Sequence, residues 1–526
     1  MSPTSTTLYP KTANEPKVHP LIRKSFVFVP SAGARYAPEV LILELMREVF
    51  YPQHFGDDTK TRELNANERD EQKRYRYTDR ERAVLHALRG RRKKTKHSKA
   101  TEYFAPAYPV LAKYAWFRKS AERVLNNFLL SGPIAQYLWH RGHGTEEGNR
   151  LQQELLEKIW SALLGGRSCL DQALDGKDIL AATLGPETFD TDGGLPTRNL
   201  HERTNQCDSV IRMDEEDEIA NRVTQDLTAM CDLEAELPRM QWLELLMTFL
   251  RFALPMWLLA QMQITGLLHA WLTDAVDNGN IASADVVLRS LLRRNRGLLH
   301  PTLTPTRELF EHVERYMKCR VEVNIFLYCL EAIRQDRVGG KTLKLEGGGR
   351  DALSVDQLLI LARDASGDIR DMERFRAIAD RLDVRTFLTR EGEAFAAWRN
   401  PLMRGQGKNI DEFFRVLYRA ELGDEAGGYL LVPEGRGARR GFRVFPGQML
   451  LKTATYLAAQ GRWSSRPRRG AGKLVLEDVE EHFGQYGIDF STAADARPLL
   501  MKELQEMGLL TGSPDAGSSV AVACPY

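Results

Sequence analysis

The stretch "LLMKELQEMGLL", residues 499–510, and the tail "SSVAVACPY", residues 518–526, decide how the C-terminal part of the chain folds. The first stretch belongs to the longer segment "STAADARPLLMKELQEMGLL", residues 491–510, which predicts an amphipathic helix that starts at Ser491 and stops at Gly508. Its apolar face consists of Leu499, Leu500, Leu504 and Met507. After a turn rich in Pro, Asp, Gly and Ser, Val520 and Val522 alternate as in a short return strand.

Two further elements precede this helix. "PGQMLLKTATYLAAQ", residues 446–460, predicts one helix, and "KLVLEDVEEHFGQYG", residues 473–487, predicts a short strand that runs into a second helix. This order of elements over about 446–526 resembles the winged helix-turn-helix superfamily. The resemblance implies that the third helix enters the major groove of DNA. It implies groove contacts by Ser491, Thr492, Arg497, Lys502 and the wing tip around 513–519.

The charge of the predicted third helix departs from that of a DNA reader. Asp495, Glu503 and Glu506 stand beside only two basic residues, and the wing carries Asp515 and no base. Because phosphate contact needs positive charge, this composition favours protein docking more than is usual for the superfamily.

The remainder of the chain predicts a mainly α-helical protein in which a multi-helical body precedes the C-terminal winged-helix (α+β) domain. The predicted parts are an N-terminal region with a basic arm at 1–100, a helical segment at 101–165, a linker at 166–212, a helical body at 213–445 and the winged-helix domain at 446–526. Within the body, 213–236 and 239–276 are predicted helices, and Thr304–Pro305 is a predicted helix start. "YLLVP" and "GFRVF", at 429–433 and 441–445, could pair as a hairpin.

One apolar stretch raises the question of a membrane span. Residues 252–273 include 22 positions without a formal charge, and Pro255 lies near the start, where a first helical turn tolerates proline. Gln261, Thr265, His269 and Thr273 recur every fourth residue and form a weakly polar stripe. This pattern favours a buried core helix over a membrane span.

Clusters of Lys and Arg are the main indication of a partner. Residues 73–99 carry twelve basic residues against Asp79 and Glu81, although the net charge of the whole chain is only +2. Three further clusters occur at 288–297, 436–443 and 462–469. Such density favours contact with phosphates, and therefore a nucleic acid, with duplex DNA as the expected partner. The candidate contacts are Lys73, Arg74, Arg76, Arg89, Arg91, Arg92, Lys93, Lys94, Lys96, Lys99, Arg289, Arg293, Arg296, Arg436, Arg439, Arg440, Arg466, Arg468, Arg469, Arg497 and Lys502. An acidic protein, or the acidic segment 213–218, is the alternative partner for these clusters.

Catalytic motifs are incomplete throughout the chain. "VGGKT", residues 338–342, lacks the first glycine and the helix of a phosphate-binding loop. His140 and His143 lie near Glu146 and Glu147 and could bind a metal, but a hydrogen-bonded surface pair is the favoured interpretation. Six scattered cysteines without a CxxC pair indicate neither a zinc ribbon nor a disulfide scaffold. We therefore expect no cofactor, no metal and no catalytic residues.

Together these patterns predict a cytoplasmic, non-catalytic nucleic-acid-binding subunit that works with partner proteins, in a setting such as bacterial antiviral or plasmid defence. Two alternatives stay open: a scaffold whose winged helix docks a partner ATPase, and a divergent metal-dependent nuclease. The cytoplasm follows from the scattered thiols and from the lack of an apolar leader in the first residues.

Overall fold

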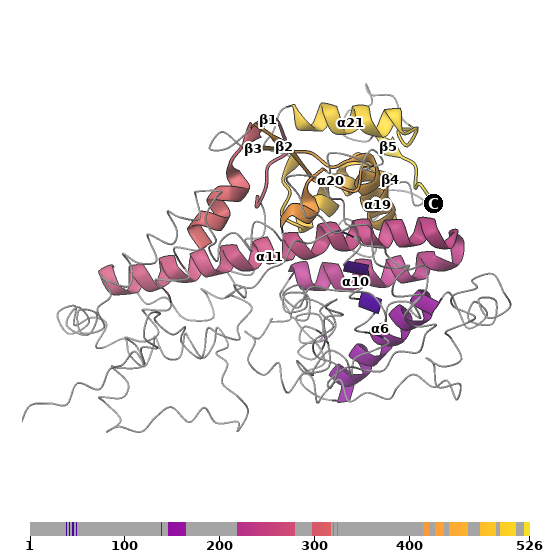
Figure 1. The fold of residues 1–526 in the computed structure, drawn as a ribbon, viewed down its shortest axis with the longest axis horizontal. Helices are drawn as coiled ribbons and strands as arrows, with labels where there is room; N and C mark the ends of the chain where they lie inside the picture. The colour runs from indigo at the N-terminus through magenta and orange to yellow at the C-terminus, as the bar shows by residue number, and fades with distance from the viewer. Residues whose placement is uncertain are drawn as a thin grey trace, which may run out of the picture.

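A computed structural model describes about a third of the chain, mostly in its central and C-terminal parts (Figure 1). The described residues are 146–164, 218–278, 297–316, 414–419, 427–435, 441–460, 474–490, 495–511 and 520–526, with single positions at 38, 41, 42, 45, 46, 49, 138, 319 and 323. The described part is rich in helix and contains a small antiparallel sheet, in agreement with a mainly α-helical protein.

A helical hairpin forms the centre of this part. Helix α10, Glu218–Asp232, continues through the 3-10 turn η6, Leu233–Glu236, and the chain then returns as the long helix α11, Arg239–Asn278. Figure 1 shows α6, Glu146–Leu164, on one side of this hairpin and the C-terminal elements on the other. The predicted helices over 213–236 and 239–276 thus agree with the structure to within a few residues at each end.

Two cross-links hold α6 to the hairpin. Arg239, the first residue of α11, donates hydrogen bonds to the backbone oxygens of Ala162 and Leu163 at the end of α6. These carbonyls have no partner inside their own helix, so the guanidinium satisfies them and also complements the negative end of the helix dipole. Lys158 of α6 pairs with Asp232 of α10, with Nζ 2.9 Å from Oδ1.

Helix α11 is apolar almost all round, and most of its described side chains from Trp242 to Met262 are buried. It is the one helix in the described residues that is long and apolar enough to cross a membrane by length and composition, but 89% of its most apolar stretch is buried inside the protein. The predicted buried helix at 252–273 therefore lies in α11. The expectation for Pro255 was wrong, because this residue lies well inside the helix and not in its first turn. A proline there removes one backbone hydrogen bond, and packing on the surrounding elements compensates for that loss.

The three-stranded sheet has the order β1-β3-β2, and both pairings are antiparallel. Its strands are β1, Thr302–Thr306, β2, Leu431–Glu434, and β3, Gly441–Val444. The predicted hairpin at 429–445 is confirmed by β2 and β3, in which Leu431 faces Val444 and Glu434 faces Gly441. The predicted helix start at Thr304–Pro305 was wrong, because both residues lie in β1 and the helix follows at 308–316. Pro305 and Pro433 lie on the two edge strands, where a missing N–H breaks no ladder bond.

The C-terminal elements follow in the order α19, β4, α20, α21 and β5. Their bounds are Gln448–Ala459 for α19, Leu474–Val475 for β4, Leu476–Gln485 for α20, Ala496–Glu506 for α21 and Ala521–Val522 for β5. Strand β4 pairs with β5, and Leu510 bridges to Val522 on the other side of β5. Helices α19 and α20 pack against the helical hairpin of α10 and α11, while α21 lies on the side away from that hairpin (Figure 1). Leu500 and Leu504 are buried as predicted, whereas Leu499 and Met507 are half-buried.

One apolar core joins these parts. It includes Trp242 and Trp257 of α11, Phe483 of α20 and Leu504 of α21. The same core also includes five helical residues from the N-terminal region: Leu41, Ile42, Leu45, Met46 and Val49. Residues on both sides of position 446 therefore share a single packed interior.

Candidate functional site

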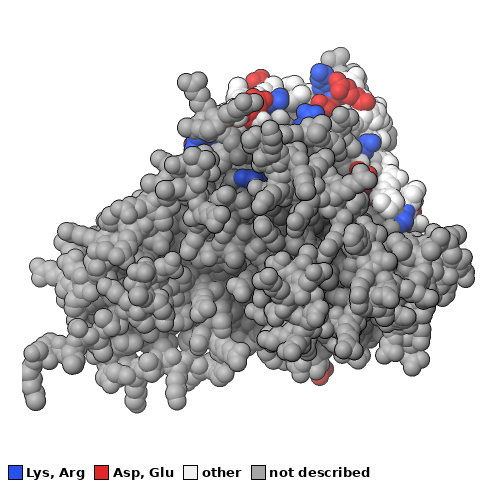
Figure 2. Space-filling view, in the orientation of Figure 1, with Lys and Arg blue, Asp and Glu red and all other residues white. Residues whose placement is uncertain are grey.

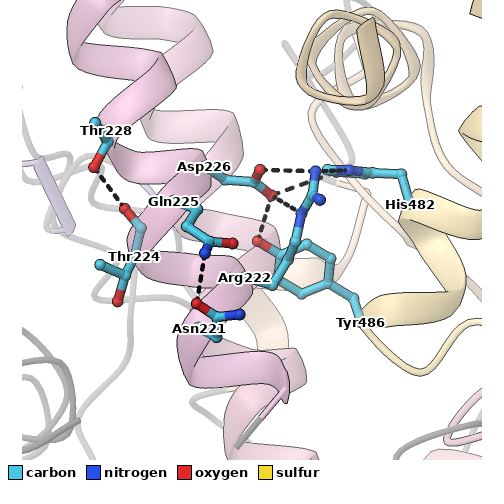
Figure 3. Close-up of polar contacts among 8 residues, drawn as sticks. All are labelled: Asn221, Arg222, Thr224, Gln225, Asp226, Thr228, His482 and Tyr486. Carbon is cyan, nitrogen blue, oxygen red and sulfur yellow. Dashed lines mark hydrogen bonds and ion pairs between the residues drawn. The ribbon is translucent and has the colours of Figure 1, made fainter. Parts of the chain in front are cut away.

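Four polar side chains meet in the interior between α10 and α20, and we call them the buried cluster: Arg222, Asp226, His482 and Tyr486 (Figure 3). Helix α10 contributes Arg222 and Asp226, whose spacing of four places both on one helical face. His482 lies on α20, and Tyr486 is the residue that directly follows this helix. All four side chains are almost fully buried, and the most exposed, Arg222, keeps 4% of its side-chain surface.

Asp226 is the centre of the buried cluster. Arg222 approaches it with both Nε, 3.0 Å from Oδ2, and a terminal nitrogen, 2.9 Å from Oδ1. The Tyr486 hydroxyl donates a third contact to Oδ2 at 2.8 Å. The carboxylate is therefore held by a two-point guanidinium contact and a phenol, which is the arrangement that a buried charge requires.

His482 contacts the same guanidinium from the other helix. Its Nδ1 forms a hydrogen bond with a terminal nitrogen of Arg222. Its Nε2 makes no hydrogen bond and lies 3.5 Å from Oδ2 of Asp226. The rings of Tyr486 and Phe483 pack against the imidazole, with centroids 5.6 and 6.3 Å away.

Burial sets the protonation of these groups. Burial and the neighbouring Arg222 hold the pKa of His482 well below its ordinary value of 6.5, so the imidazole is neutral at pH 7. Burial and the Asp226 charge raise the pKa of Tyr486 well above 10, which keeps its hydroxyl as a donor. Burial raises the pKa of Asp226, and Arg222 and Tyr486 act in the opposite direction.

The buried cluster joins elements and offers no surface to a substrate. Its members lie beneath the surface, and their polar atoms are directed at one another (Figure 3). Within the residues that the structure describes, no group of three or more His, Cys, Asp or Glu could hold a metal ion. The arrangement is therefore suited to holding α20 on α10.

Of the predicted nucleic-acid contacts, only Arg497 and Lys502 lie within the described residues. Arg497 binds Glu477 and Glu480 of α20, at 2.5 and 3.1 Å, and 42% of its side chain remains exposed. Lys502 lies 3.6 Å from Glu506 on its own helix. Both positively charged side chains thus form ion pairs with glutamates, and the pairs of Arg497 link α21 to α20.

The outer face of α21 carries both signs of charge. Asp495, Glu506 and Lys502 are exposed, and Glu503 is half-buried. Figure 2 shows Lys, Arg, Asp and Glu interspersed on the described surface at the top of the view, over α21, without a continuous basic patch. This face provides little attraction for phosphates.

The other predicted contacts lie outside the described residues. They are Lys73, Arg74, Arg76, Arg89, Arg91, Arg92, Lys93, Lys94, Lys96, Lys99, Arg289, Arg293, Arg296, Arg436, Arg439, Arg440, Arg466, Arg468 and Arg469. His140 and His143, Ser491 and Thr492, and the wing tip at 513–519 also fall outside. The segment with Arg436, Arg439 and Arg440 connects β2 to β3, and Arg443 next to it forms an ion pair with Glu434 across the hairpin.

Sequence reasoning missed the buried cluster. The Arg–Asp pair at 222 and 226 has the spacing of a helical ion pair, which is ordinary on a solvent-exposed face. His482 lies in the helix predicted within 473–487, where no motif distinguishes it from its neighbours. The partners of His482 and Tyr486 are 260 positions away in the chain, so no local pattern could pair them.

Comparisons of the chain with protein-family models, with curated proteins and with solved structures find no match.

Proposed function

We propose that the chain is a non-catalytic subunit that binds double-stranded DNA through its basic segments and works with partner proteins in the cytoplasm. The observation that carries the proposal is the charge of residues 73–99, where twelve Lys and Arg stand against two acids in a chain of net charge +2. A segment of this density can displace several counterions from a duplex.

A winged helix at 446–526 is part of the proposal. What supports it is the order α19, β4, α20, α21 and β5, together with the pairing of β4 and Leu510 with β5. In this fold the third helix and the wing form the recognition surface. Helix α21 lies on the side away from α10 and α11 (Figure 1), and its residues Lys502, Gln505 and Glu506 are exposed.

The charges of α21 indicate that DNA binding and protein binding belong to different parts of the chain. Arg497 and Lys502 are engaged with glutamates, and acidic residues share the same outer face. We therefore assign the phosphate contacts to "RGRRKKTKHSKA", residues 89–100, which includes the most basic part of the cluster at 73–99. We assign the outer face of α21 to contact with a protein partner.

The test is binding of the purified protein to a labelled random-sequence DNA duplex over a series of salt concentrations. We expect affinity to fall steeply with salt, with a slope of about −0.9 per neutralised phosphate. Replacing Arg91, Arg92, Lys93, Lys94 and Lys96 with Gln should weaken binding to every sequence and reduce the magnitude of the slope by up to about 4.5.

A matched control separates the basic segment from α21. Replacing Arg497 and Lys502 with Gln removes two positive charges from α21 and should leave the salt slope unchanged. A large loss in this variant would instead place α21 on the duplex. Absence of binding even at low salt would overturn the DNA proposal and leave protein docking as the function of the C-terminal module, residues 446–526.

A further inference from the structure

Helix α20 is held to the body of the protein by three kinds of contact. The buried cluster links it to α10. Phe252 of α11 packs against Phe483 and Tyr486, with ring centroids 5.8 and 4.8 Å apart. Beyond the helix, the backbone oxygen of Gly487 accepts hydrogen bonds from the amides of residues 298 and 299, and the Asp489 amide donates to the oxygen of Leu299 at 3.2 Å.

The hydrogen bonds of the buried cluster are compatible with one protonation state of His482. A guanidinium carries only donors, so the contact between Arg222 and Nδ1 requires Nδ1 to be the acceptor. The imidazole proton must then lie on Nε2, which faces Oδ2 of Asp226 at 3.5 Å. In this state the buried cluster contains one positive and one negative charge.

A second proton on His482 would place a donor on Nδ1, directly against the guanidinium. The hydrogen bond to Arg222 would be lost, and two positive charges would share an interior with one carboxylate. Since an uncompensated charge is strongly unfavourable in the interior, the protonated imidazole must either leave the interior or displace Arg222.

We propose that protonation of His482 releases α20 from α10, so that the buried cluster acts as a pH-sensitive attachment of the C-terminal module to the helical body. The inference rests on the geometry of the buried cluster and is independent of what the chain binds.

The neighbouring elements offer His482 no second carboxylate in the described contacts. Helix α10 contributes Arg222 and Asp226, and Tyr486 directly follows α20. Asp478 of α20, four residues before His482, accepts a hydrogen bond from the backbone amide of Val475. Helix α11 presents the apolar Phe252 to this region, and α19, which packs on α20, has Lys452 as its single charged residue. Asp226 is therefore the one acid in contact with the imidazole among these groups, and Arg222 and Tyr486 already occupy it.

The sign of the pH dependence follows from the depressed pKa of His482. In the released state the imidazole regains a pKa near 6.5, above that of the attached state. The attached state is thus favoured above about pH 6.5 and loses free energy as the pH falls below that value. Asp226, whose pKa burial raises, acts in the opposite direction, so a variant without the imidazole is needed to isolate the effect.

Hydrogen–deuterium exchange of the full-length protein, read by mass spectrometry at about pH 7.5 and pH 5.5 and corrected for intrinsic exchange, tests the proposal. We expect amides in 479–490 to exchange about tenfold faster at the lower pH, the factor for one unit below the pKa of a free imidazole. Amides of α6, residues 146–164, should keep their protection and serve as the internal reference.

Two variants give the result its meaning. His482→Gln retains an acceptor for Arg222 but cannot be protonated, and it should lose the pH response. Tyr486→Phe removes one bond to Asp226 but keeps the imidazole, so exchange should rise at both pH values while the pH response remains. The proposal is overturned by unchanged exchange in the wild-type protein, by a response that persists in His482→Gln, or by loss of protection that extends to α6.

Discussion

Arg222 and Asp226 show how strongly a single residue depends on its partner in this interior. Both are charged and nearly without solvent contact, and each satisfies the other through two contacts. Removing one partner of such a pair leaves an uncompensated buried charge, whereas an ion pair on the surface contributes little.

Arg222→Met should therefore lower the free energy of unfolding by about 3–5 kcal/mol, because Asp226 loses its positively charged partner and Nδ1 of His482 loses its donor. Tyr486→Phe should cost less, about 1–3 kcal/mol, since Arg222 still holds the carboxylate. Urea denaturation followed by circular dichroism gives both values.

The matched control is Arg150→Met in α6. Arg150 also pairs with two carboxylates, Glu147 and Glu154, but its side chain is 59% exposed, so we expect no measurable change. Equal losses in the Arg150 and Arg222 variants would contradict the role of burial.

At the scale of elements, local sequence preference and tertiary packing disagree in two places. Thr304–Pro305 has the character of a helix start, yet β1 forms there because Thr302 and Thr306 pair with Val444 and Phe442 of β3. Pro255 should interrupt α11, yet the helix continues because its apolar surface is buried along this stretch. In both places packing outweighs the local preference.

Two glycines make the dependence of an element on its surroundings measurable. Gly427 has a positive φ of 78°, and a Cβ there would lie 2.6 Å from the backbone nitrogen of Gln448, at the start of α19. Gly427→Ala should lower the free energy of unfolding by at least about 1 kcal/mol, because both the backbone conformation and the close approach exclude a side chain.

The control for this variant is Gly484→Ala, inside α20, where a Cβ would meet nothing within 4 Å. Alanine is the better helix former, so this variant should be more stable by about 0.5–1 kcal/mol. Thermal or urea unfolding of the two proteins should therefore show shifts of opposite sign. A gain in stability for Gly427→Ala would rule out the close packing of this turn on α19.

At the scale of the whole molecule, the described residues before and after position 446 bury their apolar side chains in one another. Helix α19 packs on α11, and Phe252 lies against Phe483 and Tyr486 of the C-terminal module. The C-terminal module and the helical body thus depend on the same core, although the sequence predicts a helical body up to residue 445 and a separate domain from residue 446.

A chain that ends at residue 445 should consequently expose apolar surface of α10 and α11. We expect it to bind the dye ANS more strongly than the full-length protein and to aggregate at concentrations where the full-length protein stays dispersed. Dye fluorescence and light scattering measure the two effects. A truncated chain that is monomeric, binds little dye and unfolds cooperatively would show that the body has a core of its own.

The amino-acid sequence by itself determined the local elements of the described part. Helical spacing of apolar residues placed α10, α11, α19, α20 and the buried face of α21, and strand alternation around a glycine-rich loop placed the hairpin of β2 and β3. These features depend on neighbours a few residues apart, so they can be read from the chain directly.

Only the tertiary structure decided which polar residues meet. The bond between Tyr486 and Asp226 spans 260 positions, and the ion pairs of Arg497 with α20 depend on how two helices pack. Contacts of this kind leave no periodic pattern in the sequence, because residues far apart in the chain meet only when the helices pack together. The ion pairs of Arg497 with Glu477 and Glu480 join two helices, whereas Lys502 lies near Glu506 on its own helix, a local spacing that the sequence already contains.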